Sequence, residues 1–247
     1  MLKECVREIG GSPVQKAEAL LRWHHPDLGT INPMEFIPLA EDTRLITEIG
    51  NWVFQQAANQ AAQWRARYYP DFQVSINISP AQFNDRKEVA LPWLEYLQKI
   101  DLPSRGIIVE ITEDLLLDPS LKVKDQLQTL REAGIEIALD DFGTGYSTLS
   151  YLKRFDIDYI KVDRSFVNNI TSDSDEAALC EAIVVMAHKL GIKVIAEGIE
   201  ADEQKYLLVK ADCDYGQGYL FSKPISSNSL EELLKTSVFH FQEMLEL

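Results

Sequence analysis

The sequence predicts an α/β fold, a TIM-like (β/α)8 barrel, and two observations carry the prediction. Short stretches rich in β-branched residues alternate with longer amphipathic stretches along the whole chain. Such alternation is typical of right-handed βαβ units around a parallel sheet, and about seven or eight units within 247 residues fit a closed barrel. An open, doubly wound sheet is the alternative fold.

The predicted strands share a short apolar run that closes on a polar residue. In chain order they are residues 14–21, 74–79, 107–112, 136–142, 159–163, 193–198 and, more weakly, 214–221. The spacing leaves room for a helix after most of these strands.

The predicted helices carry apolar residues at steps of three and four. They cover residues 46–68, 91–100, 121–134, 175–191 and 201–211, and a terminal helix is expected over 237–247. Gly134 and Gly191 stand where two of these helices stop, as is common at helix C-termini.

Composition predicts a single folded domain over residues 1–247. The chain is 46% hydrophobic and 26% charged, with no linker or low-complexity tract. Its net charge of −15 disfavours general DNA binding. The chain lacks both a long apolar run and a signal-peptide start, so we expect a cytoplasmic domain without membrane contact. Its three cysteines match no metal-finger spacing, so we expect their thiols to be structural.

Polar residues close almost every predicted strand. They are Glu18, Asn77, Glu110, Asp140, Asp141, Lys161, Glu197 and Gln217. The active site of a parallel barrel lies at the carboxyl ends of its strands, so these side chains are expected to converge on one pocket. Any one acid taken alone is more simply a solvated strand end or a capping carboxylate.

Converging carboxylates predict bound metal. Burial and like charge both raise the pKa of an acid, so a group of buried acids stays ionised only with a cation among them. Oxygen donors without cysteine or histidine favour Mg²⁺ or Mn²⁺ over Zn²⁺. The adjacent pair Asp140 and Asp141 suggests two ions, and a plain turn before Gly143 is the alternative.

Two basic residues belong to the same part of the predicted barrel. Lys161 lies in an apolar strand, where it either pairs with a carboxylate or serves the site. Arg22 follows an apolar stretch and either reaches the surface or binds a phosphate oxygen.

The ordered motifs of the chain resemble the EAL domain family. They are EALLRW from Glu18, FIPLAE from Phe36, NIS from Asn77, EITE from Glu110, DDFGTGYS from Asp140, IKVD from Ile160, AEGIE from Ala196 and QGYLFSKP from Gln217. The resemblance implies a barrel that hydrolyses cyclic di-GMP to linear pGpG with two Mg²⁺ or Mn²⁺ ions, calcium being inhibitory.

The resemblance also implies a role for each matching residue. One metal would be held by Glu18, Asn77, Glu110 and Asp140, and the other by Asp140, Asp141 and Glu197. Lys161 would contact the attacking water, acting with Glu18 and Glu197 as the catalytic group. Substrate would meet Leu20, Arg22, Asp163 and Gln217, and Glu113 would anchor the loop of Gly143, Thr144 and Gly145.

The chain departs from the family pattern at its first strand. Glu4 and Cys5 stand where the family usually has a guanine-contacting glutamine and a proline, which leaves substrate affinity open. A silent cyclic di-GMP receptor is therefore one rival function, and a barrel hydrolase acting on another phosphodiester is a second.

The family also implies partners beyond the barrel itself. A sensory, receiver or GGDEF domain is expected in the same polypeptide, and such a domain could anchor the protein to a membrane. A homodimer is expected through the loop and helix of residues 141–155. In that segment Tyr151, Leu152 and Phe155 fit a dimer contact and core packing equally well.

Overall fold

A computed structural model describes residues 2–9, 14–83, 88–117, 121–143, 152 and 155–245. Within these ranges, side chains are described except at residues 2–5, 7, 8, 117, 121 and 237–245. Within this part of the chain, every helix is too short or too polar to span a lipid bilayer.

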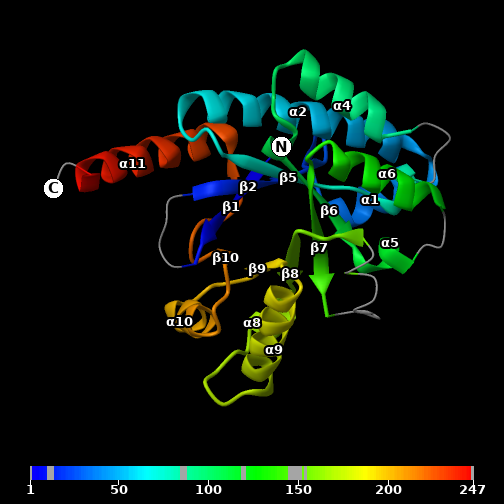
Figure 1. The fold of residues 1–247 in the computed structure, drawn as a ribbon. Coiled ribbons are helices and arrows are strands. Elements are labelled where there is room, and N and C mark those ends of the chain that lie inside the picture. Colours follow the sequence, from blue (N-terminus) through cyan, green and yellow to red (C-terminus); the bar gives the residue numbers. More distant parts are fainter. Residues whose placement is uncertain are drawn as a thin grey trace.

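Eight of the described strands form a closed ring (Figure 1). In ring order they are β1 (Leu2–Glu8), β2 (Val14–Leu20), β5 (Gln73–Asn77), β6 (Ile107–Thr112), β7 (Glu136–Phe142), β8 (Tyr159–Val162), β9 (Lys193–Ala196) and β10 (Tyr215–Gln217). Pairing of Val6 with Gln217 joins the two ends of the sheet. The predicted barrel is confirmed, and a short β11 (Ile225–Ser226) extends the sheet beyond β1.

The first strand differs from the all-parallel barrel that the sequence predicts. Strands β2 to β10 run parallel around the ring, whereas β1 is antiparallel to both β2 and β10. The link between Glu8 and Val14 has too few residues for the crossover that a parallel pair requires. The length of this link therefore agrees with the antiparallel pairing of β1 and β2.

Helices cover the outside of the ring (Figure 1). They are α1 (Pro33–Asp42), α2 (Leu45–Arg67), α3 (Pro80–Phe83), α4 (Ala90–Lys99), the 3₁₀ turn η1 (Ser104–Gly106), α5 (Glu113–Leu117), α6 (Leu121–Glu132), α8 (Arg164–Val167), α9 (Asp175–Lys189), α10 (Asp202–Lys210) and α11 (Ser227–Leu245). A two-stranded hairpin, β3 (Trp23–His25) and β4 (Gly29–Ile31), follows β2. The predicted helices agree with α2, α4, α6, α9, α10 and the end of α11 within a few residues.

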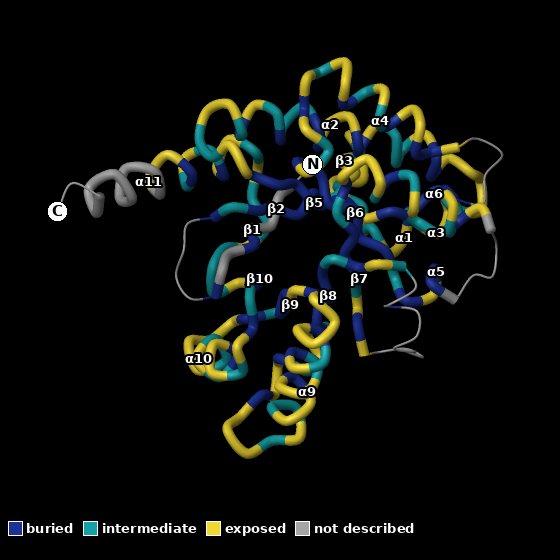
Figure 2. The backbone as a smooth tube through the Cα atoms, in the orientation of Figure 1, coloured by how far each residue is buried: buried dark blue, intermediate teal, exposed yellow. Residues whose placement is uncertain are grey.

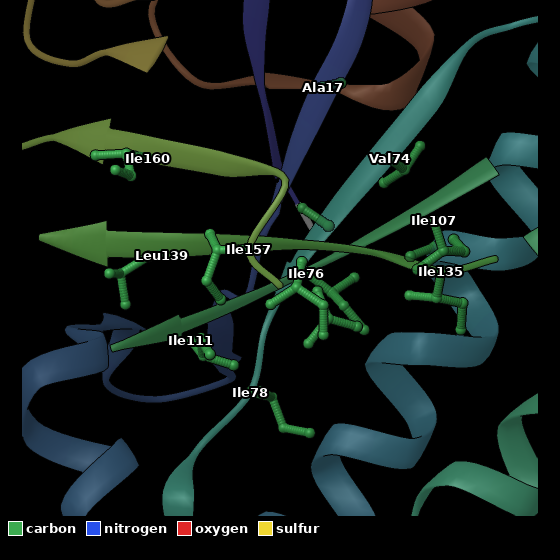
Figure 3. Packing of buried hydrophobic residues seen from close by; sticks show 14 of the residues in the cluster. Ala17, Val74, Ile76, Ile78, Ile107, Ile111, Ile135, Leu139, Ile157 and Ile160 are labelled. Atoms are coloured by element: carbon green, nitrogen blue, oxygen red, sulfur yellow. The ribbon is translucent and has the colours of Figure 1, made fainter. Parts of the chain in front are cut away.

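The main core lies between the strands and these helices. Val74 and Ile76 on β5 and Ile107 and Ile111 on β6 are buried in it (Figure 3). Figure 2 shows strands buried along their length beneath helices whose outer turns are exposed. Because side chains alternate along a strand, Ser75, Glu110 and their equivalents are left to face the barrel interior.

The interior at the amino ends of the strands is filled by a polar group separate from the predicted site. Lys16 contacts Gln73, lies 3.1 Å from the Tyr159 hydroxyl, and sits 4.9 Å from the centre of that ring. Tyr159 in turn donates to Glu136 over 3.0 Å. The carboxyl ends are thereby left as the open end of the barrel.

Gly218 closes the turn after β10, and the Gly218→Ala variant is expected to lose about 2–4 kcal/mol of unfolding free energy. A methyl group there would lie 2.3 Å from both the backbone nitrogen and the oxygen of Ile199, and the residue has φ +151°. Urea unfolding measures the loss. Gly191→Ala is the control, because its φ of +77° is equally unsuited to alanine while no atom lies within 4 Å, so about 1–2 kcal/mol is expected. Equal losses in the two variants would contradict a steric cause.

Candidate metal and catalytic site

Lys161 is the centre of the site at the carboxyl ends of the strands. Its Nζ lies 2.8 Å from Glu110, 2.8 Å from Glu197, 3.0 Å from Asp140 and 3.5 Å from Glu18. These residues come from β6, the turn after β9, β7 and β2, so segments far apart in the chain meet at one ammonium group. We call Lys161 and these four acids the carboxylate cluster.

Lys161 is charged although only 1% of its side chain is exposed. Its neighbours Ile160 and Val162 face the outer core, so strand alternation directs the lysine inward. Burial lowers the pKa of Lys161, but the charges of Glu110, Glu18 and the other two acids raise it well above its ordinary value. The lysine therefore pairs with several carboxylates at once.

Glu18 is held by two side-chain amides. Asn77 Nδ2 donates to Oε1 and Gln217 Nε2 donates to Oε2, each over 2.7 Å. Burial raises the pKa of Glu18, yet Lys161 and these amides bring it below its ordinary value, so Glu18 is ionised. The Oε1 atom of Gln217 is buried without a hydrogen-bond partner in the described structure, which is a costly position for an acceptor.

The carboxylate cluster carries more negative charge than one lysine can neutralise. Burial and the charge of Glu18 raise the pKa of Glu110 well above its ordinary value, although Lys161 lowers it. Burial likewise raises the pKa of Glu197 to about 7 against the opposing effect of Lys161. The cluster is therefore a site where additional cations are strongly favoured.

A break in β7 brings Asp140 and Asp141 to the same side. Asp141 has φ +53°, and the pairing of β7 with β8 shifts register between Leu139 and Phe142. Oxygen atoms of Asp140, Asp141 and Glu197 consequently lie within 4.8 Å of one another. Burial, followed by the charge of Asp140, raises the pKa of Asp141. These are the three acids that the family resemblance assigns to one of the two metals.

Glu113 fixes the turn that follows Asp141. Its Oε1 accepts a hydrogen bond from the backbone N–H of Gly143 over 2.8 Å. Gly143 has φ +98°, and a methyl group there would lie 2.8 Å from the ring of Phe166. Thr144 and Gly145, predicted to belong to the same loop, lie outside the described residues.

The predicted substrate-binding residues other than Gln217 stand at or just beyond the carboxyl ends of β2 and β8. Arg22 donates from Nη1 to the neighbouring carbonyl of Leu21 over 2.7 Å, beside an apolar cavity of about 580 Å³. Asp163 caps α8 by accepting from Ser165 N over 2.9 Å, and Leu20 ends β2 half-buried. Their roles toward substrate stay predictions.

Residues outside the predicted site bear on three further expectations: the dimer contact, the cysteines and the first strand. Leu152 is 3% exposed and Phe155 packs against the main core, which favours packing for both, while Tyr151 lies outside the described residues. Cys180 and Cys213 are buried free thiols. The side chains of Glu4 and Cys5 are not described, but the backbone of Glu4 pairs with that of Glu18.

Sequence reasoning missed three residues that contact the site's turns, which are Arg164, Phe166 and Gln204. Gly143 in the DFG sequence could have indicated that another group approaches the backbone there, but it does not indicate that this group is the Phe166 ring. Gln204 lies on α10 and has no sequence signal beyond its helical pattern.

Comparison with known proteins identifies relatives for nearly the whole chain. The family model described as EAL domain matches residues 6–224. The bifunctional diguanylate cyclase/cyclic di-GMP phosphodiesterase MucR of Pseudomonas aeruginosa is 39% identical over 221 residues, which cover 88% of this chain and 32% of that protein. The chain spans about a quarter to a third of the length of MucR and two other curated relatives that it matches.

Two solved structures resemble the fold closely. The PaMucR phosphodiesterase in complex with c-di-GMP has a TM-score of 0.86 at 36% identity, covering 93% of this chain and 92% of that one. The manganese and cy-diGMP complex of Klebsiella pneumoniae BlrP1 has a TM-score of 0.77 at 30% identity, covering 92% of this chain and 56% of that one. Because the matched residues include the whole carboxylate cluster and both turns beside it, the chain belongs to the EAL domain family.

Proposed function

We propose that the chain hydrolyses cyclic di-GMP to linear pGpG with the help of two Mg²⁺ or Mn²⁺ ions. The observation that carries the proposal is the single buried lysine facing four carboxylates at the open end of the barrel. Membership of the EAL domain family and the likeness to a phosphodiesterase solved with c-di-GMP support the choice of substrate.

The residues present fit two divalent cations. One ion would be held by Glu18, Asn77, Glu110 and Asp140, and the other by Asp140, Asp141 and Glu197. Every donor is an oxygen atom, as these ions prefer, and the second set already lies within 4.8 Å. Since Asn77 Nδ2 donates to Glu18, its Oδ1 atom is the one available to a cation. Two such ions lower the pKa of a bound water and stabilise charge on the phosphoryl oxygens.

The protein's own groups orient the reactants. Lys161 Nζ, kept charged by the carboxylates, would hold the attacking water and favour its deprotonated form. Arg22 would turn from the Leu21 carbonyl to a phosphate oxygen, because a charge-assisted contact is stronger than one to a neutral carbonyl. Leu20, Asp163 and Gln217 would line the path of the substrate. Attack would break the bond from phosphorus to a ribose 3′-oxygen.

A silent cyclic di-GMP receptor is the second candidate, favoured by one observation. Glu4 replaces the glutamine that the family pattern places on the first strand, and its backbone lies next to Glu18 in the sheet. A change there would affect how guanine binds before it affects the carboxylate cluster.

Incubation with cyclic di-GMP and Mn²⁺, followed by chromatography of the products, tests the proposal. Formation of pGpG that stops with EDTA or Ca²⁺ is the expected result. Calorimetric binding of cyclic di-GMP without any product would identify a receptor. Hydrolysis of another phosphodiester, with no action on cyclic di-GMP, would point to the remaining rival.

We further propose that the barrel works in the cytoplasm as a homodimer and as one domain of a longer signalling protein. The relatives support a longer protein, because the matched region is a minor part of their length. Sedimentation velocity at two concentrations tests the homodimer. A single monomer at both concentrations would contradict it.

A further inference from the structure

The short helix α8 touches both turns that carry the Asp140, Asp141 and Glu197 carboxylates. It follows β8 directly (Figure 1), and β8 lies between β7 and β9 in the sheet. Its first turn is capped by the Asp163 side chain. Its contacts with each turn are made by different residues.

Phe166 supports the turn after β7. The ring atoms Cε2 and Cζ stand 2.8 Å from the place where a methyl group on Gly143 would be, so ring and backbone are in close contact. The same glycine is tied to Glu113 through its N–H. The turn that carries Asp140 and Asp141 is therefore fixed between a carboxylate and an aromatic ring.

Arg164 supports the turn after β9. A methyl group on Gly198 would lie 2.5 Å from the Cβ atom of Arg164, and Gly198 has φ +71°. This glycine directly follows Glu197, so the position of the carboxylate depends on how closely its turn approaches α8. On its far side the same turn is bonded to β10 through Ile199 N and the Gln217 carbonyl, 3.0 Å apart.

Gln204 joins α8 to that turn through one side chain. Its Oε1 accepts from the backbone N–H groups of Glu200 and Ala201 over 2.7 and 2.9 Å. Its Nε2 donates to the carbonyls of Val167 and Asn168 over 3.1 and 3.3 Å, at the C-terminal end of α8. One amide thereby satisfies four backbone groups from two separate segments.

We propose that Gln204 is a positioning residue that, through α8, sets the distance between Glu197 and the pair Asp140 and Asp141, and so sets the affinity of these carboxylates for a divalent cation. The inference rests on the proposed metal-dependent function and deepens it. Three like charges on two turns repel one another, and Lys161 offsets only part of that repulsion, so the spacing of the turns also depends on the contacts that hold each turn against α8. Such supporting contacts commonly change metal affinity by 10–100-fold.

The Gln204→Glu variant tests the link with almost no change in shape. A carboxylate still accepts from Glu200 and Ala201 but cannot donate to Val167 and Asn168, and it adds repulsion against their carbonyls. Mn²⁺ titration calorimetry on the full chain, without substrate, is expected to show binding to one of two sites weakened about tenfold or more. Gln204→Met, which removes all four bonds without adding charge, should show a similar loss.

Gln56→Glu is the matched control, because Gln56 is exposed on α2 and the change in charge is the same. It should leave Mn²⁺ binding unchanged. In Gln204→Glu, activity lost at low Mn²⁺ should return at high Mn²⁺ with the KM for cyclic di-GMP unaltered, which a general loss of fold would not produce.

Two outcomes would overturn the inference, and a third would reject only the proposed function. Lower stability of both Gln204 variants with unchanged Mn²⁺ affinity would reduce Gln204 to a structural residue, while leaving the proposed function intact. Wild-type chain that binds no Mn²⁺ would reject the inference together with the metal-dependent function. Normal Mn²⁺ binding by wild type without hydrolysis of cyclic di-GMP would reject the function alone, and the titrations of the variants would still decide the role of Gln204.

Discussion

The Lys161→Met variant is expected to lose at least about a hundredfold in kcat for cyclic di-GMP and about 3–5 kcal/mol of unfolding free energy when metal is removed. Methionine fills a similar volume but leaves Glu18, Glu110 and the other two acids of the cluster facing one another without the ammonium group. Buried carboxylates without a partner must either take up protons or force water into the barrel.

The two losses are separated by measuring unfolding with urea in EDTA and again in excess Mn²⁺. Metal should restore most of the stability of Lys161→Met, because cations then neutralise the acids, while hydrolysis should stay low. Lys122→Met is the control, since Lys122 is exposed on α6 and distant in sequence from every strand-end residue. Unchanged hydrolysis would remove Lys161 from the mechanism, and unchanged stability in EDTA would mean that the acids already hold protons.

The position of Lys161 could be predicted because it depends on local pattern. An apolar strand in which every second residue faces the outer core must turn the intervening residue inward, and the strand ends collect at the open face of the barrel. The same reasoning places Glu110 between Val109 and Ile111, both buried in the outer core. Alternation along two strands, together with the rule that barrel sites lie at the carboxyl ends of strands, was sufficient to predict the positions of Lys161 and Glu110.

The remaining parts of the site depend on contacts between distant segments, which no local pattern encodes. Asp140 and Asp141 are neighbours that alternation would direct to opposite faces, and only the left-handed backbone of Asp141 brings them together. Gln204 acts through four backbone groups on other elements. The reversed direction of β1, by contrast, could have been predicted from the few residues between Glu8 and Val14.

The Asp140→Asn variant is expected to show the opposite pattern to Lys161→Met, losing metal and activity while keeping its fold. Asp140 belongs to both proposed donor sets, so replacing it should weaken Mn²⁺ binding by about a hundredfold or more. It should also reduce kcat by about a thousandfold, because several kcal/mol of electrostatic stabilisation in the transition state depend on the ions. Its Oδ1 lies 3.0 Å from Lys161, but three other acids remain around the ammonium group.

Removing one negative charge from a cluster with too many should therefore leave stability in EDTA within about 1 kcal/mol of wild type, or raise it. Mn²⁺ calorimetry measures metal affinity, urea unfolding measures stability and the pGpG assay measures kcat, all on the same preparation. Asp27→Asn is the control, because Asp27 is exposed on the β3–β4 turn. A loss of stability in EDTA as large as that of Lys161→Met would show that Asp140 is a structural partner of the lysine. Near-normal Mn²⁺ affinity would contradict its place between two ions, because a shared ligand cannot be lost without weakening both sites.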